Sequence, residues 1–517
     1  MIHTYDDAIA YLDQLIATPV QQRASTGLRR TELLLAEVGN PQHRFATLHV
    51  TGTSGKGSTA TMAASILRAA GYHVGLFTSP HLTDLTERIV VDGEPVSRAD
   101  WTRLLERVRP LVDAMTAGTL PGYTLGRPAR MQVLWPMAAL YFAEQAVDIA
   151  VVEVGMGGRY DSTNVNNARV AVITNVTREH IGPLGHTLAD IAHHKAGVAK
   201  PDGIVVTASQ EPEALAVIAT ECAAQGSALW TVAPEGASAA DAADAADAAD
   251  AADAAKVWEL SAWERGCLAR PRVGPGTGET PALPGIPLPS PQRRLFTDPA
   301  DAASAVRYAG RVGRLDVKTP VRAYNDLRMG PLGRHQYANA ACAVAAVDAL
   351  GVLGIVRVEP AAVRQGLAAA RVPGRLEQVA DDPPMWLDGA HNPDAARTLA
   401  AALRELFPRR RLVLLLGILG DKDLRAMVDA LAPLAHAIVV TEPPWQARGG
   451  QSAEVARLAA AHVSPSRIAV IPDVPAALRH AQHLARGLGT DGGADATVIV
   501  TGSLILVGAV RGLTSDE

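Results

Sequence analysis

Apolar residues recur along the first half of the chain in two alternating patterns. Near-continuous apolar runs, typical of buried parallel strands, occur at 46–50, 73–79, 148–155 and 169–176. Apolar positions at helical spacing predict helices in the first 50 residues, after the turn at 51–58, and over about 98–116 and 133–146. Strands that alternate with helices predict a doubly wound α/β layer with a mostly parallel sheet.

The alternation restarts at about residue 385 and continues to the last residues of the sequence. Five apolar runs alternate here with amphipathic helical patterns over about 140 residues. The pattern breaks near Ala370–Gly374, a stretch that ends in Pro373-Gly374, and this break marks a hinge. We therefore expect a domain over 1–371 and a smaller, Rossmann-like α/β domain over 372–517.

Residues from about 232 to 320 break both patterns. Asp-Ala-Ala triplets fill 241–255, and a helix built from them would spread its aspartates over every face. A stretch dense in proline and glycine follows. Both features favour a low-complexity insertion at the surface over a catalytic element.

Charge and composition exclude several classes of protein. The net charge of −5 equals the five aspartates of the 241–253 tract, so the rest of the chain sums to zero. Because of this charge balance, no nucleic-acid-binding surface is predicted. Extensive stacking on bases is not predicted either, since aromatic residues make up only 4% of the chain. Three scattered cysteines fit a reducing cytoplasm. The longest apolar runs are too short to span a bilayer, and the first residues do not resemble a signal peptide.

A glycine-rich turn joins the predicted strand at 46–50 to the helix that follows. Its residues are Gly52, Thr53, Ser54, Gly55, Lys56, Gly57 and Ser58. Glycines let backbone N–H groups surround a phosphate, and the helix N-terminus adds positive potential. Lys56 is expected to reach the β- and γ-phosphates, and a hydroxyl at Ser58 or Thr59 to bind Mg²⁺. The spacing differs from the common phosphate-loop pattern, so a glycine-rich helix entry without a ligand is the alternative.

Polar residues follow the next predicted strands. Glu153 ends the run 148–155, where open α/β sheets bind ligands, and a carboxylate there suits Mg²⁺. His180 follows the run 169–176, either as a metal or nucleotide ligand or as a hydrogen-bonded structural group. Lys195 lies in a short helical pattern and taken alone is a surface lysine.

The second domain opens with Leu387-Asp388-Gly389-Ala390-His391-Asn392-Pro393, a strand end followed by a helix start. Asp388 and His391 are candidates for contact with ATP, and an Asp and Asn that cap the helix are the alternative. The chain has no G-x-S-x-G segment, so nucleophilic hydrolysis is unsupported.

Taken together and in order, these motifs make the chain resemble the folylpolyglutamate synthase/dihydrofolate synthase family, a branch of the Mur ligase superfamily. The resemblance covers nearly the whole chain outside 232–320. Further segments that carry it are Gly27-Leu28-Arg29, Thr78-Ser79-Pro80-His81-Leu82, Gly155-Met156-Gly157-Gly158-Arg159, Lys195-Ala196-Gly197, Gly333-Arg334-His335-Gln336, Pro373-Gly374-Arg375-Leu376-Glu377 and Asp421-Lys422-Asp423.

The resemblance implies an ATP-dependent amide ligase, a monomer whose small-molecule substrates are ATP, L-glutamate and a pterin or folate acid. In that family the substrate carboxylate attacks the γ-phosphate of ATP, and L-glutamate captures the acyl phosphate. Catalytic roles then fall to Lys56, Lys195, His180 and His391. Two Mg²⁺ ions are implied on Ser58, Ser79, Glu153, His180 and a carbamylated Lys195. The nucleotide positions include Gln336, Asn339, Arg375, Asp388 and His391. Ser79, His81 and Asp161 match substrate positions, Asp161 near the pterin ring.

Six residues at four places depart from the family pattern. Ser54 stands where asparagine is usual, Arg178-Glu179 precedes His180 in place of Leu-Asp, and His194 replaces a glutamate. Met131-Gln132 replaces a Phe-Glu pair that lies by the pterin in relatives. The ATP machinery is therefore expected to be intact, whereas the acceptor pocket departs from the family.

Three alternatives stay open. A murein-type ligase is disfavoured because only 51 residues precede Gly52, too few for a UDP-binding domain. A ligase for a non-folate carboxylate is motivated by the altered 131–142 segment. A non-catalytic ATP-binding protein need not retain the charged set of Lys56, Glu153, His180 and Lys195. The sequence leaves open whether the first glutamate, later glutamates or both are added.

Overall fold

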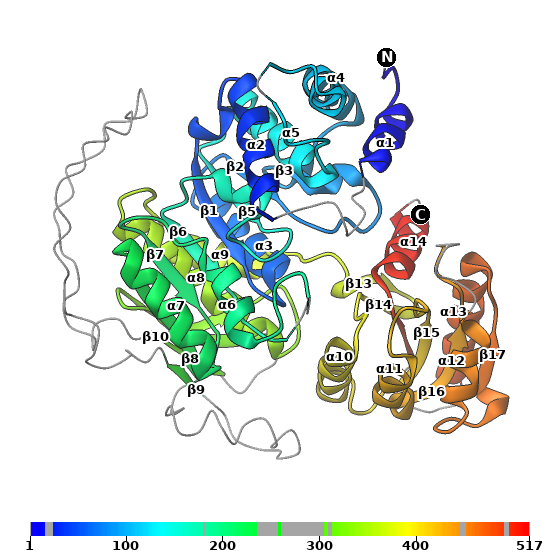
Figure 1. Cartoon of the computed structure of the whole chain (residues 1–517). Helices are drawn as coiled ribbons and strands as arrows, with labels where there is room; N and C mark the ends of the chain where they lie inside the picture. Colours follow the sequence, from blue (N-terminus) through cyan, green and yellow to red (C-terminus); the bar gives the residue numbers. More distant parts are fainter. Residues whose placement is uncertain are drawn as a thin grey trace. The chain divides into compact units, whose positions relative to one another are not determined.

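The computed structural model describes the chain over 2–15, 24–121, 123–178, 182–234, 257–259, 304–308, 313–444, 451–490 and 496–515. It divides into two compact units, each described here by itself (Figure 1). Unit 1 comprises Met1–Ser79, Thr86–Gly330 and Tyr337–Ala370. Unit 2 comprises Pro80–Leu85, Pro331–Gln336 and Arg371–Glu517. The sequence pattern predicted a division near 371 and gave no sign that the two short segments belong with unit 2.

The predicted alternation of strands and helices is confirmed in unit 1. Its helices are α1 (Tyr5–Gln14), α2 (Ala24–Glu37), α3 (Lys56–Ala69), α4 (Arg98–Ala117), α5 (Arg130–Glu144), α6 (Leu188–Ala196), α7 (Pro212–Gln225), α8 (His335–Val352) and α9 (Pro360–Ala369). Its strands are β1 (Ala46–Thr51), β2 (Val74–Phe77), β3 (Ile89–Val91), β4 (Glu94–Pro95), β5 (Ile149–Glu153), β6 (Val170–Ile173), β7 (Ile204–Thr207), β8 (Ala228–Pro234), β9 (Val257–Glu259), β10 (Ser304–Tyr308), β11 (Arg314–Lys318) and β12 (Ala323–Arg328).

The strands of unit 1 form one sheet, in which β1 lies between β5 and β6. The order is β12-β11-β10-β8-β7-β6-β1-β5-β2-β3-β4, with β9 paired to β10. From β2 to β10 the neighbouring strands run parallel, and both margins turn antiparallel. The parallel register brings the carboxyl ends of β1, β5 and β6 to the same edge of the sheet.

Apolar side chains cover both faces of this sheet. Leu48 and Val50 of β1 belong to a core that includes residues of α3, α8 and α9. On the opposite face, Ala171 and Ile173 of β6 pack in a core with α6 and α7. Helices on both faces make the sheet doubly wound, as expected for a parallel sheet whose strands are nearly continuous apolar runs.

Part of the expected insertion at 232–320 takes part in the sheet. β10 continues it parallel to β8, and β11 pairs antiparallel with β10. β12, just beyond residue 320, pairs antiparallel with β11 and completes this margin. The Asp-Ala tract and most of the proline-rich stretch, within 235–256 and 260–303, lie outside the described residues.

Unit 2 is the second α/β sheet that the sequence pattern predicts. Its strands are β13 (Arg375–Asp381), β14 (Pro384–Asp388), β15 (Arg411–Leu416), β16 (Ala435–Val440), β17 (Ile468–Val470) and β18 (Ala496–Thr501). Its helices are α10 (Pro393–Leu406), α11 (Leu424–Leu431), α12 (Ser452–Ala459), α13 (Val474–Thr490) and α14 (Leu504–Ser515). The order is β13-β14-β18-β15-β16-β17, parallel except for β13. One core contains residues of α10–α12 and the other residues of α13 and α14, so this sheet is also covered on both faces.

Across the described part of both units, no helix is long and apolar enough to cross a membrane.

The contact between α3 and α9 predicts a sharp difference between two helical glycines. A Cβ at Gly366 would lie 2.4 Å from Cα of Ile66 and 2.6 Å from the carbonyl oxygen of Ser65. Because backbone atoms cannot move aside, we expect Gly366→Ala to lower the free energy of unfolding by about 2–3 kcal/mol. Gly487→Ala, where nothing lies within 4 Å, should instead stabilise by up to about 1 kcal/mol. Urea unfolding of both variants checks this, and equal midpoints would contradict it.

Candidate active site

The glycine-rich turn predicted to bind phosphate joins the end of β1 to the start of α3. Gly55 is the N-cap of α3 with a φ of 81°, and as a glycine it has no side chain to cap the helix. The Lys56 ammonium donates to the carbonyl oxygens of Gly52 and Thr53, both at 3.1 Å. The uncapped helix N-terminus and this ammonium give the turn the positive potential that a phosphate needs.

Residues after β6 hold the turn in shape. The Thr174 hydroxyl donates to the carbonyl oxygen of Ser54 at 2.6 Å. Oδ1 of the Asn175 side chain accepts from the backbone N–H of Ser54 at 2.8 Å. The backbone carbonyl oxygen of Asn175 accepts from the backbone N–H of Thr53 at 2.9 Å. Sequence reasoning missed both residues because each reads as an ordinary polar residue after an apolar run. The only available signal was their position at the carboxyl end of a strand.

Two close approaches explain the glycines of the turn. A Cβ at Gly52 would lie 1.8 Å from the Thr174 hydroxyl oxygen, and one at Gly55 would lie 2.1 Å from Oδ1 of Asn339. Both glycines also have positive φ, which other residues rarely adopt. Asn339, on α8, is therefore brought against the phosphate loop.

Glu153 and Ser79 meet at the end of β5. The Ser79 backbone N–H donates to Oε2 of Glu153 at 2.8 Å. A Cβ added at Gly57, the residue before Ser58 in the first turn of α3, would lie 3.4 Å from Oε2 of Glu153. Glu153 is 3% and Ser58 5% exposed. Three of the predicted metal-site residues thus gather beside the phosphate loop.

The other two predicted metal ligands are His180 and Lys195. His180 lies outside the described residues. Lys195 is buried in the last turn of α6, which packs on the glycine-rich segment after β5. A Cβ at Gly158 would lie 2.9 Å from the Lys195 carbonyl oxygen, and the Arg159 N–H donates to the His194 carbonyl oxygen at 2.6 Å. Over the residues that the structure describes, no group of three His, Cys, Asp or Glu side chains is arranged to hold a metal by itself.

The Asp161 carboxylate is bonded within its own loop. Oδ1 accepts from the backbone N–H of Thr163 at 2.9 Å and from the Thr163 hydroxyl at 2.6 Å. Oδ2 accepts from the Met156 N–H at 3.1 Å. Burial raises the pKa of Asp161, and these donors oppose that rise. Its carboxylate therefore organises the turn from 155 to 163.

Arg88 is a buried cation at this site that sequence reasoning missed. It is the last residue of the 3-10 helix Leu85–Arg88, and burial lowers its pKa to about 10 while the charge of Glu153 opposes the shift. Its Nη1 donates to Sδ of Met131 at 3.4 Å. The Met131 methyl in turn lies 3.5 Å from a Cβ position at Gly155. The altered Met131 thus lies against the glycine segment that carries Asp161.

Gln132 has a local role. Its side-chain oxygen accepts from the Ala129 N–H at 2.9 Å, which caps the start of α5. A Cβ at Gly27 would lie 2.7 Å from its amide nitrogen. The residue therefore joins α2 and α5 and is 5% exposed.

The other predicted nucleotide and substrate residues belong to unit 2: His81, Gln336, Arg375, Asp388 and His391. Asp388 is buried, which raises its pKa; the Arg375 charge and the N–H groups of Leu376 and Ala390 oppose the shift. The His391 ring bonds the Gly389 carbonyl oxygen at 2.9 Å. Asn392 caps α10, so the capping alternative holds for Asn392, whereas the Asp388 carboxylate bonds the strand-end backbone.

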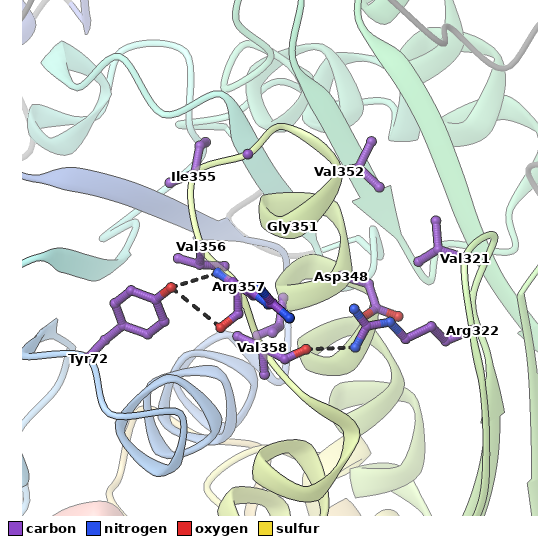
Figure 2. Close-up of a pocket in the computed structure, with 12 residues that line it drawn as sticks. Tyr72, Val321, Arg322, Asp348, Gly351, Val352, Ile355, Val356, Arg357 and Val358 are labelled. Atoms are coloured by element: carbon purple, nitrogen blue, oxygen red, sulfur yellow. Dashed lines mark hydrogen bonds between the residues drawn. The ribbon is translucent and has the colours of Figure 1, made fainter. Parts of the chain in front are cut away.

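Unit 1 contains a cavity of about 550 Å³, whose lining includes Tyr72, Arg322 and Val358 (Figure 2). It lies away from the phosphate loop. Val352 lines it at the end of α8, roughly 20 Å along the helix from Asn339. Its polar groups are bonded within the protein: Arg322 donates to the Val358 carbonyl oxygen at 2.6 Å, and the Tyr72 hydroxyl accepts from the Arg357 N–H at 2.6 Å. This cavity therefore offers few free polar groups to a substrate.

Comparisons with known proteins agree with this geometry. Residues 116–264 match the Mur ligase middle domain, and residues 374–504 match the Mur ligase glutamate ligase domain. The chain is 32% identical over 439 residues to the dihydrofolate synthase/folylpolyglutamate synthase of Bacillus subtilis, covering 85% of each chain. It is 32% identical over 512 residues to the Mycobacterium tuberculosis protein of the same name, covering 95% of this chain and 91% of that one.

Solved structures give the same result. Mycobacterium tuberculosis folylpolyglutamate synthase complexed with ADP matches with a TM-score of 0.75 and 29% identity, over 99% of this chain and 98% of that chain. A complex of folylpolyglutamate synthase (FPGS) with AMPPCP and folate matches with a TM-score of 0.68 and 28% identity, over 99% of each chain.

The approach of Thr174 to Gly52 predicts a selective loss of nucleotide binding. We expect Gly52→Ala to raise the Kd for AMPPCP at least about tenfold, because the new methyl group pushes the loop out of shape. Gly71→Ala is the matched control, since Gly71 also has a positive φ but nothing within 4 Å. It should cost about 1 kcal/mol of stability without a change in nucleotide affinity. Calorimetric titration distinguishes the two, and an unchanged Kd for Gly52→Ala would contradict the assigned loop.

Proposed function

Because this chain belongs to the folylpolyglutamate synthase/dihydrofolate synthase family of Mur ligases, we propose that its phosphate-loop site activates a pterin or folate acid for condensation with L-glutamate. The chain is an ATP-dependent glutamate ligase of the dihydrofolate synthase/folylpolyglutamate synthase kind. The observation that carries the site assignment is the meeting of Glu153 and Ser79 beside the phosphate loop.

The reaction consists of two transfers. A carboxylate oxygen of the acceptor acid attacks the γ-phosphorus of ATP, the bond to the β-γ bridging oxygen breaks, and ADP leaves with an acyl phosphate behind. The amine of L-glutamate then attacks the acyl carbon, loses a proton and expels phosphate, so that an amide forms. The protein must offset phosphate charge and hold the reactants in line.

The phosphate loop supplies the charge for the first transfer. In this structure the Lys56 ammonium is held by two loop carbonyl oxygens, so it is already within the loop that receives the phosphates. We propose that it moves from these carbonyls onto the β- and γ-phosphate oxygens. Backbone N–H groups at the start of α3 add to its effect because α3 lacks a side-chain cap there.

The donor set beside the loop fits Mg²⁺. Glu153 offers a carboxylate, and Ser58 and Ser79 offer hydroxyls, which are the hard oxygen ligands this ion prefers. We propose that these three residues hold one ion and that His180 and a carbamylated Lys195 hold a second. When bound, Mg²⁺ neutralises charge on the transferred phosphoryl group. The burial of Lys195 at the end of α6 is compatible with a carbamate, which converts its cation into an oxygen ligand.

We further propose that Gln336, Arg375, Asp388 and His391, which belong to unit 2, are nucleotide-binding residues, and that Asn339 of unit 1 is another. We propose that His391 has a catalytic role toward the phosphates and that His81 contacts the acceptor. We also propose that the protein is a cytoplasmic monomer, in keeping with the buried, free thiols of Cys222 and Cys342.

ADP release tests the proposed function directly. With ATP, Mg²⁺ and L-glutamate, we expect release in the presence of 7,8-dihydropteroate and of tetrahydrofolate, and none without an acceptor. Lys56→Ala should lower kcat at least about 100-fold, because the transferred charge loses its counter-ion. Lys318→Ala, at an exposed lysine on β11, is the control and should leave kcat unchanged. Release that persists in Lys56→Ala would remove the phosphate-loop assignment.

The contact of Met131 with Arg88 and Gly155 supports a role in acceptor choice. We expect Met131→Phe, which restores the usual family residue, to change the KM for the acceptor by roughly tenfold and leave the KM for ATP unchanged. Steady-state kinetics with both acceptors measure this. If the wild-type protein binds ATP but releases no ADP with either 7,8-dihydropteroate or tetrahydrofolate, a different acceptor carboxylate is favoured. An unchanged acceptor KM in Met131→Phe would place Met131 outside the acceptor site.

A further inference from the structure

Two polar side chains on one face of β1 bond the segment that follows β5. His49 and Thr51 are two residues apart and point to the face opposite Leu48 and Val50. The Thr51 hydroxyl donates to the carbonyl oxygen of Gly157. Nε2 of His49 lies 2.8 Å from the Thr163 hydroxyl oxygen. Both His49 and Thr163 are fully buried.

The hydrogen-bond partners fix the direction of this chain of bonds. The Thr163 hydroxyl donates its proton to Oδ1 of Asp161 at 2.6 Å, so it accepts from His49. His49 therefore carries its proton on Nε2. Burial, assisted by the positive charge of Lys200, lowers the pKa of His49 to about 3, so the ring is neutral at neutral pH. Among the residues that the structure describes, Nδ1 of His49 has no hydrogen-bond partner.

The end of this chain of bonds is the carboxylate that organises the loop. With the Thr163 hydroxyl fixed as a donor, Oδ1 of Asp161 is held as an acceptor, and Oδ2 accepts from the Met156 N–H. The loop also contacts the Met131 methyl at Gly155 and the end of α6 at Gly158. His49 is thus linked through the Thr163 hydroxyl to the loop that carries Asp161, a residue that the family resemblance assigns to the acceptor.

We propose that His49 is a positioning residue that acts through the Thr163 hydroxyl to orient the Asp161 carboxylate and the 155–161 loop for the acceptor. This role of His49 rests on the proposed function, because it requires that Asp161 faces the acceptor acid. β1 then serves both substrates: its end leads into the phosphate loop, while His49 within it sets the acceptor loop.

Two matched pairs of variants test this role. His49→Leu and Thr163→Val each replace the polar side chain by an apolar one of similar size, which removes the hydrogen bond between residues 49 and 163. His49→Gln and Thr163→Ser each keep a group able to make it. We expect the first two to raise the acceptor KM at least tenfold while the KM for ATP stays within twofold. The second two should stay within threefold of wild type in both constants.

Hydrogen exchange gives a readout that does not depend on turnover. In the full-length protein, His49→Leu and Thr163→Val should increase amide exchange in peptides that span 155–165 at least tenfold, and His49→Gln and Thr163→Ser should not. Peptides from β7 and α7 serve as internal controls. If the wild-type protein accepted neither folate acid, the proposed function would fail, and the exchange data alone would decide the role of His49.

Three results would overturn the proposal. One is an acceptor KM and loop exchange within twofold of wild type in His49→Leu and Thr163→Val. Another is a loss that affects ATP and acceptor constants equally and is not rescued by His49→Gln or Thr163→Ser, which would indicate a purely structural residue. The last is increased exchange throughout unit 1. If His49→Leu does not fold, the Thr163 pair decides the outcome.

Discussion

The proposed phosphate loop, residues 52–58, depends on the absence of side chains at the two places where its backbone meets neighbouring residues. Thr174 approaches Gly52 and Asn339 approaches Gly55 so closely that neither glycine has room for a methyl group. The contacts come from the end of β6 and from α8, far apart in the sequence. A loop built of flexible residues is therefore made rigid by its surroundings, which is what preorganised phosphate binding requires.

β1 connects this loop to the rest of the site. Its apolar residues anchor α3 and α8, whereas its alternate polar residues bond the segment after β5. Glu153 ends β5 directly beside it, in register with Val50. Because neighbouring parallel strands end at one edge of the sheet, a shift of β1 along its axis would alter the geometry of the phosphate loop, the carboxylate and the Asp161 loop together.

Much of the fold could be predicted because buried parallel strands leave nearly continuous apolar runs and amphipathic helices leave a periodic pattern. The placement of Glu153 at a strand end followed from the same pattern. Thr174, Asn175 and His49 could not be assigned in this way, because a polar residue near an apolar run shows no partner until the sheet order is known. β10 and β11 were missed because the biased composition around them obscures short strands. Arg88 was missed because its burial depends on tertiary packing.

The order in which the chain enters the two units limits how the protein can be divided. It passes between them after residues 79, 85, 330, 336 and 370. Leu82 packs against the core of unit 2 that contains Val507, although about 290 residues separate it from Arg371. A fragment that begins at Arg371 therefore lacks part of its own interior. A truncation after residue 370 keeps every segment of unit 1, whereas no single truncation yields all of unit 2 without unit 1. A proteolytic nick near 371 would therefore leave the larger fragment holding two short segments that the smaller fragment needs for its own interior.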